Sequence, residues 1–247
     1  MRWLSKLVLV LVLFWSSPSW AVQSIVQSAL DAATQPWVTD GIAELTFSGD
    51  FTVGNTVCVG FGLDASSRSV SSVTDDGASS NTYALATTTE ASGALEAWMY
   101  CGLVTNAANV ITVTLSSACA CTGVIFGWEV GDSHATTPVG NVDAHFISVA
   151  TTSHPTPLVG DLALTDAGAM LLGFTYGSTG TYTLDATYVS LWNRNVGTGG
   201  SKLISAADNM VNTTSGNESS LNLLVEIRPS ASAPSVNFFP RRLQVLQ

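Results

Sequence analysis

The sequence predicts an all-β protein, an antiparallel β-sandwich of about a dozen short strands. The chain is rich in Thr, Val, Ser and Gly and contains few Lys and Glu residues, a composition that favours strands and turns over helices. Short runs of alternating apolar and polar residues recur along the chain, separated by turn-forming residues. Hydrophobic residues make up 46% of the chain, which is enough to supply an ordered core.

The strands are expected to follow one another with short connections. The run at 95–103 is apolar on both faces by the two-residue period, with Trp98 on one face and Met99 on the other, so we expect a central strand there. Residues 25–33 fit either a short helix or a first edge strand. In chain order, the expected strands are 42–47, 56–63, 70–74, 82–88, 95–103, 110–116, 122–130, 145–150, 169–176, 182–187, 202–206 and 221–227.

Residues 1–21 have the three parts of a secretory signal peptide. Arg2 and Lys6 give a basic start, residues 7–15 are apolar, and residues 19–21 (Ser-Trp-Ala) place small side chains where signal peptidase reads. The apolar run is shorter than the roughly 20 residues that a spanning helix needs. We therefore expect cleavage after residue 21 and a product that is secreted or held at the cell surface, with the periplasm as an alternative. No later stretch predicts membrane insertion.

The charge of the chain excludes two classes of partner. Removal of Arg2 and Lys6 with the signal peptide leaves 6 basic residues against 18 acidic ones, a net charge of −12. Such a surface repels phosphate backbones and anionic lipid headgroups. We expect neither nucleic-acid binding nor electrostatic attachment to a membrane.

One β-sandwich domain is expected over residues 22–228. The stretch at 134–160 is rich in Pro and Gly, and joins two lobes or forms a long loop on one sandwich. Residues 128–130 (Trp-Glu-Val) recur as 225–227 (Val-Glu-Ile), 97 positions later. Val-Gly-Phe at 59–61 recurs as Leu-Gly-Phe 113 positions later. Because the offsets differ, these similarities indicate related strand patterns rather than a repeat.

Residues 229–247 are expected to form a flexible C-terminal tail. A low-complexity stretch at 230–234 is followed by Phe-Phe-Pro-Arg-Arg-Leu at 238–243. A frayed terminus is the simpler interpretation. The alternative is a peptide that docks onto a partner.

Four short motifs carry a resemblance to a known kind of module. They are the strand at 57–61, Ser-Val-Thr-Asp at 72–75, Asn-Thr-Tyr at 81–83 and the strand at 109–115. In this order they resemble the jelly-roll-like β-sandwich modules of bacterial surface proteins and of phage tail or fibre proteins. The resemblance covers about residues 22–228, and it implies a binding or structural module with no catalytic residues to transfer.

The four cysteines of an exported chain predict disulfides. Cys101 is expected at one end of the strand at 110–116 and both Cys119 and Cys121 at the other. That separation is too long for a bridge, because bridged Cα atoms lie within about 7 Å. We expect a Cys58–Cys101 bridge, with Cys119 and Cys121 either bridged to each other or free. A metal site built on these cysteines and a histidine lacks the required spacing.

Catalytic signals are weak. His134, His145 and His154 are 11 and 9 positions apart, which fits no zinc motif, so we interpret them as solvated loop residues. No Gly-x-Ser-x-Gly motif is present.

Carboxylates offer the best case for an enzyme, because glycoside hydrolysis needs two of them at one bond. Glu90 and Glu96 bracket a turn, and the Glu-x-Asp-x-Glu strand of sandwich-fold glucanases is absent. Glu129 and Glu226 lie inside apolar runs, where we expect them at outward-facing strand positions.

Sugar binding needs aromatic faces beside short polar side chains. The run Trp192, Asn193, Arg194 and Asn195 is the local candidate. Trp98 and Tyr100 form a second aromatic stripe. Packing in the core is the competing interpretation for both.

A turn at residues 75–81 offers oxygen ligands for Ca²⁺ through Asp75 and Asp76. It lacks the closing bidentate Glu, so a plain turn is favoured. We expect no cofactor and no metal.

These observations favour an exported, non-catalytic binding or adhesion module that takes a glycan or another cell-surface component. The alternatives are a secreted carbohydrate-active enzyme and a structural protein of a particle or envelope. The ligand and the oligomeric state are left open.

Cleavage of the signal peptide is the first testable prediction. Because residues 19–21 present small side chains to the peptidase, the exported protein is expected to begin at Val22. N-terminal sequencing or intact-mass measurement of the exported product checks this. A product that still carries residues 7–15 would contradict it.

Overall fold

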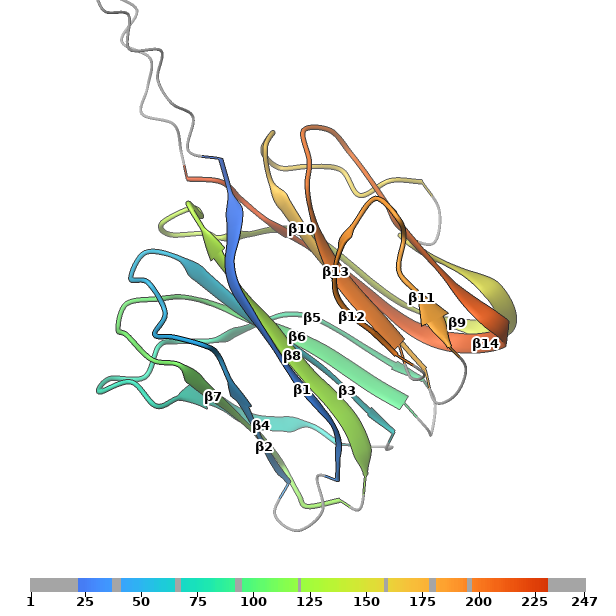
Figure 1. Cartoon of the computed structure of the whole chain (residues 1–247), viewed down its shortest axis with the longest axis horizontal. Coiled ribbons are helices and arrows are strands. Elements are labelled where there is room, and N and C mark those ends of the chain that lie inside the picture. The colour runs from blue at the N-terminus through green and yellow to red at the C-terminus, as the bar shows by residue number, and fades with distance from the viewer. Residues whose placement is uncertain are drawn as a thin grey trace, which may run out of the picture.

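A computed structural model describes residues 22–36, 41–64, 68–91, 95–119, 121–157, 160–177, 181–194 and 197–230. These residues form strands and no helix, so none of them belongs to a helix that could cross a membrane. The strands pair in antiparallel sheets that stack as layers (Figure 1). The all-β, sandwich-like fold expected from the sequence is confirmed.

The strands fall into three sheets. The strand bounds are β1 Ser24–Pro36, β2 Ile42–Thr46, β3 Thr56–Asp64, β4 Val70–Asp75, β5 Ala84–Ala91, β6 Leu95–Leu103, β7 Val110–Leu115, β8 Thr122–Gly131, β9 Val139–Thr156, β10 Met170–Tyr176, β11 Tyr182–Thr183, β12 Val189–Arg194, β13 Gly197–Leu203 and β14 Met210–Ile227. The central sheet has the order β1-β8-β3-β6-β5, and the small sheet has the order β2-β7-β4. The partner sheet has the order β9-β14-β10-β13-β12, with β11 also paired to β14.

The central and partner sheets repeat one topology. Numbered by their order in the chain, the five strands of the central sheet lie side by side as first, fifth, second, fourth and third. The five main strands of the partner sheet, β9, β10, β12, β13 and β14, lie in the same order. We name these five-strand sets the first unit and the second unit.

The strand registers also match. Glu129 of β8 lies opposite Val57 of β3, and Glu226 of β14 lies opposite Leu171 of β10. In both units the first strand shifts register beside this glutamate, and the third strand shifts register against the fourth. The similarity between 128–130 and 225–227 therefore falls on equivalent positions.

The other sequence similarity is out of register by one residue. Val59 lies opposite Gly127, two positions before Glu129, and its counterpart lies opposite Leu224. That counterpart is Gly173, whereas alignment by sequence would pair Val59 with Leu172. A slip of one residue in a strand moves every side chain to the other face, so sequence alignment alone misplaces this strand.

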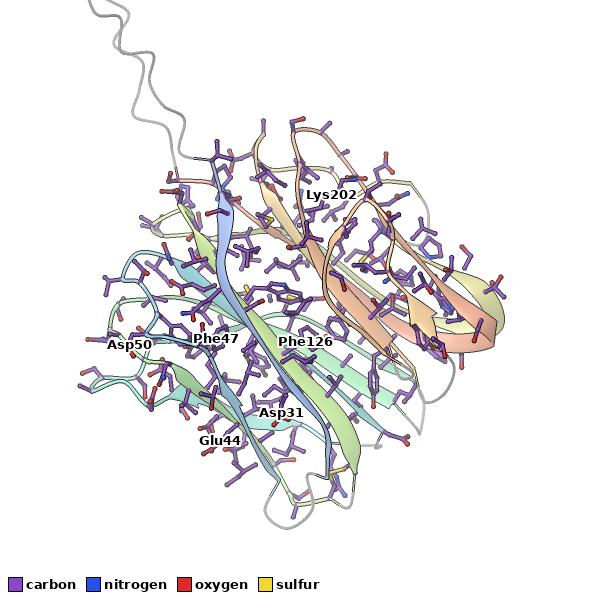
Figure 2. All side chains as sticks on the ribbon, viewed as in Figure 1. Asp31, Glu44, Phe47, Asp50, Phe126 and Lys202 are labelled. Atoms are coloured by element: carbon purple, nitrogen blue, oxygen red, sulfur yellow. A yellow bond between two sulfur atoms is a disulfide. The ribbon has the colours of Figure 1, made fainter. Side chains whose placement is uncertain are left out.

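The inner faces of the two units form the main core of the molecule. Figure 2 shows Phe126 between the central and partner sheets, where its ring meets Phe174 edge-on with centroids 4.8 Å apart. The small sheet covers the opposite face of the central sheet, and Phe47, Ile111 and Phe61 belong to the second core that lies there. The central sheet is thus buried on both faces, which explains why the apolar residues of β6 do not alternate with polar ones.

Residues 25–33 belong to edge strand β1, which was one of the two alternatives expected there. Other strand expectations need correction. The expected strand at 145–150 is the middle of β9, which begins at Val139 inside the stretch taken as a loose connection. The expected strand at 182–187 shortens to β11, and β12 was not expected at all.

Cys58 and Cys101 lie opposite each other on β3 and β6 and form the expected disulfide, with Cα atoms 4.1 Å apart. Cys119 and Cys121 form the local bridge that was one of the two alternatives.

The described chain begins and ends on one side of the molecule (Figure 1). The side chain of Gln23 donates to the carbonyl oxygen of Arg228, and Ser133 pairs with Pro229. The opposite side of the central sheet holds the start of β6, since Leu63, Glu96 and Gly123 share one register row far from Thr56.

A substitution at Gly60, which lies against the Phe126 ring, tests the packing between β3 and β8. A Cβ at Gly60 would lie 2.5 Å from the Phe126 ring, whereas a Cβ at Gly49 would meet nothing within 4 Å. We expect Gly60→Ala to lower the free energy of unfolding by about 1–3 kcal/mol through overpacking. Gly49→Ala should change it by less than about 0.5 kcal/mol. Urea denaturation of both variants measures this, and equal stabilities would contradict the packing described.

Candidate functional site

The aromatic and polar run proposed as a sugar site lies on the second unit. Trp192, Asn193 and Arg194 are in β12, and their side chains lie outside the described residues, as does Asn195 altogether. By register, β12 occupies in the second unit the position of β5 in the first. Asn193 lies opposite Thr198, as Thr88 lies opposite Trp98.

The histidines do not gather into one site. The Nδ1 atom of His145 lies 2.7 Å from Oδ2 of Asp143 on the same strand. His154 is fully buried, with Nδ1 2.6 Å from the hydroxyl oxygen of Ser220. The interpretation of these two as solvated loop residues was wrong, because both are in β9. Among the described residues, no group of three His, Cys, Asp or Glu could hold a metal ion.

The buried Ser220–His154 pair belongs to a polar network inside the second unit. Asn222 donates to the Ser220 hydroxyl at 2.9 Å and accepts from Thr175 at 2.8 Å. Asn212 donates to Thr175 at 2.8 Å. All five side chains are fully buried, so the serine and histidine have no access to a substrate. The network satisfies polar groups in the core rather than catalysing a reaction.

The Asp75 turn is held by protein donors. The carboxylate of Asp75 accepts hydrogen bonds from the backbone of Gly77, from both the backbone and the side chain of Asn81, and from the Tyr83 hydroxyl. Burial, together with the hydrogen bond to Asp75, raises the pKa of Tyr83 well above its usual value. The turn is therefore stabilised by hydrogen bonds to the side chain of one of its own residues.

Asp76 has a similar role on the neighbouring connection. Its Oδ1 atom accepts from the backbone N–H groups of Val110 and Asn109, at 3.0 and 2.9 Å, and these bonds lower the pKa of Asp76. The proposed Ca²⁺ ligands thus already serve as acceptors for the turn and for the start of β7.

Glu129 and Glu226 are fully buried, so their strand positions are covered by other parts of the protein rather than exposed to solvent. Glu129 accepts from the Thr52 backbone at 2.8 Å, the Asn55 side chain at 2.6 Å and the Gln27 side chain at 2.6 Å. It therefore fixes the loop that leads into β3 against β1 and β8. A carboxylate enclosed in this way cannot reach a polysaccharide.

Glu226 does the same in the second unit. It accepts from the backbone N–H groups of Asn141 and Thr165, both at 2.8 Å, and of Asp166 at 3.2 Å. The loop that it fixes leads into β10, the counterpart of β3. The two glutamates are thus equivalent in position and in role.

A surface depression of about 330 Å³ lies in the first unit, between the β5–β6 hairpin and the segment that leads into β4. It combines an indole, a carboxylate, a guanidinium and two hydroxyls. Its lining residues are Arg68, Thr88, Thr89, Glu96 and Trp98.

Contacts with neighbouring residues hold the side chains that line the depression in place. Trp98 is 7% exposed, and its ring stacks on Phe61 with centroids 5.1 Å apart. Glu96 is 3% exposed, and its two carboxylate oxygens accept from the backbone N–H of Arg68 at 2.9 and 3.1 Å. The Thr88 hydroxyl donates to the Ala97 carbonyl oxygen. The rims of the depression are therefore set by the sheet and by one buried carboxylate.

Known proteins add no information about this site. No protein-family model, curated protein or solved structure matches the chain.

Sequence reasoning found only part of the depression. Trp98 was noted within an aromatic stripe and Glu96 within a carboxylate pair, but no sequence signal indicated that the two residues line one site. Arg68 was missed, because it is 28 positions from Glu96 in the chain and only the fold brings it there. The one available signal was a cation between two strands in a chain with 8 basic residues.

The role of Glu129 is testable by substitution. Glu129→Gln replaces an acceptor by an amide that faces the donors of Thr52 and Gln27, so we expect a loss of about 2 kcal/mol in the free energy of unfolding. Glu44→Gln makes the same change at an exposed position of β2 (Figure 2) and should alter stability by less than about 0.5 kcal/mol. Chemical denaturation compares them, and an unaffected Glu129→Gln would refute the anchoring role.

Proposed function

We propose that this chain is an exported, non-catalytic binding module that takes a carbohydrate in the depression beside Trp98. The observation that carries the proposal is the composition of that depression. An apolar ring wall lies beside hydroxyl, carboxylate and guanidinium groups, which together suit a ligand with apolar ring faces and many hydroxyls. Its volume is at the lower end of the range of small-molecule sites, about 300–1,000 Å³, and suits a short oligosaccharide segment.

The position of the depression supports display to a partner. It lies at the side of the first unit that carries the β5–β6 connection, away from the side where Gln23 contacts Arg228. A chain tethered through either end would therefore present the depression outward. This arrangement is consistent with a module that binds a cell-surface glycan.

A secreted carbohydrate-active enzyme is the second candidate, and one observation favours it. Register places Glu90 opposite Glu96 on neighbouring strands. Glycoside hydrolysis needs two carboxylates at one bond, and this pairing brings two glutamates to neighbouring strands. Binding remains the better supported proposal, because Glu96 is almost fully buried and occupied by the Arg68 backbone.

The proposal is tested by binding of the purified protein to an oligosaccharide array, followed by titration calorimetry with the best ligand. Thr88 is exposed at the depression, so Thr88→Tyr should fill the site and weaken binding at least tenfold. Thr183→Tyr makes the same change at an exposed position of β11 in the other half of the protein and should leave affinity unchanged.

The other outcomes are distinct. Release of shorter sugars from the bound ligand, abolished in Glu96→Gln, would favour the enzyme. Assembly into particles without any sugar binding would favour a structural role. Binding that Thr88→Tyr leaves intact would place the site elsewhere and contradict the proposal.

A further inference from the structure

We infer that the depression selects glycans that carry a carboxylate, and that Arg68 is the residue that recognises it. This inference rests on the proposed function, because it names the class of sugar that the same site takes. Three properties of Arg68 support it: its fixed position, its unused donor and its lack of a carboxylate partner among the described residues.

The backbone of Arg68 is fixed by the sheet. Its N–H group donates to both oxygens of buried Glu96, and its Nη1 atom donates to the Ser117 hydroxyl at 2.9 Å. The backbone of Arg68 and one end of its guanidinium group are thus both held beside the depression. A charged group held before the ligand arrives loses less freedom on binding.

One donor of this guanidinium is unused. The Nε atom of Arg68 is buried and has no hydrogen-bond acceptor among the described residues. Buried polar atoms are nearly always paired, so this unpaired donor needs an explanation, and an acceptor on a ligand is one.

The charge of Arg68 is also uncompensated within the described part of the chain. Lys202 pairs with Asp208 there, and Arg228 pairs with Asp166, but no salt bridge joins Arg68 to a described carboxylate. Glu96 faces the backbone of Arg68 instead. The full chain has a formal net charge of −10, so an unpaired cation is an unusual feature of its surface.

A carboxylate is the ligand group that matches these properties. Guanidinium forms paired, charge-assisted hydrogen bonds with carboxylates, and its planar fork fixes their orientation. Uronic acids and other acidic sugars carry this group on a ring that can lie against Trp98, with hydroxyls in reach of Thr88 and Thr89. Glu96 also lines the depression, and both of its carboxylate oxygens accept from the backbone N–H of Arg68.

The test measures the affinity of the purified protein for matched pairs of oligosaccharides. Each pair has the same length and linkage, and differs only in whether uronate carboxylates are free or converted to methyl esters. We expect the free acids to bind at least tenfold more tightly. Arg68→Gln should remove this preference and leave the affinity for the esters nearly unchanged.

Lys202→Gln is the matched control, because it removes one positive charge on the second unit, away from the depression. It should keep the preference for the free acid. Arg68→Lys keeps the charge but not the fork, so it should retain only part of the preference.

The failures are distinguishable. If neither acids nor esters bind, the proposed function fails and this inference fails with it. If esters bind as well as acids, or if Arg68→Gln and Lys202→Gln lower the affinity for acids equally, the site binds sugars but Arg68 does not recognise a carboxylate. Only this inference is then overturned.

Discussion

The face-to-face packing of two equivalent five-stranded units is the interaction on which the rest of the structure depends. Phe126 and Trp128 of the first unit and Phe174 and Val225 of the second share one core. Each unit alone would expose an apolar face, so neither can bury its inner side chains without the other. Because both inner faces are committed to this core, loops and surface sites can be built only on the outer faces and at the ends of the strands.

The buried glutamates follow from that arrangement. Near the ends of β8 and β14, the loops that lead into β3 and β10 carry backbone N–H groups that need acceptors. Glu129 and Glu226 supply carboxylate acceptors at equivalent positions. Removing these polar groups from water is costly unless they are paired, and each glutamate accepts at least three hydrogen bonds. A buried carboxylate in this fold is therefore a structural element.

The sequence predicted the fold class and most strands because alternation and turn residues are local signals. It could not predict that Glu129 and Glu226 are buried, since a lone carboxylate in an apolar run gives no sign of the distant N–H groups that satisfy it. The similarity between residues 128–130 and 225–227 was visible but was not interpreted as a repeat, because β3 and β10 align by sequence one residue away from their true register. Only pairing across the sheet resolves a shift of one residue. Arg68 was missed for the same reason, because its neighbours in space are distant in the chain.

The two units differ where function is expected. At equivalent positions the first unit carries Phe61 and Trp98 and the second carries Thr175 and Thr198. In the first unit these side chains form an aromatic stack that supports the depression, whereas in the second Thr175 joins a buried polar network. One backbone frame therefore serves two purposes. The outer face of the first unit is itself packed against the small sheet, so only the positions that border the depression are available for side chains chosen for a ligand.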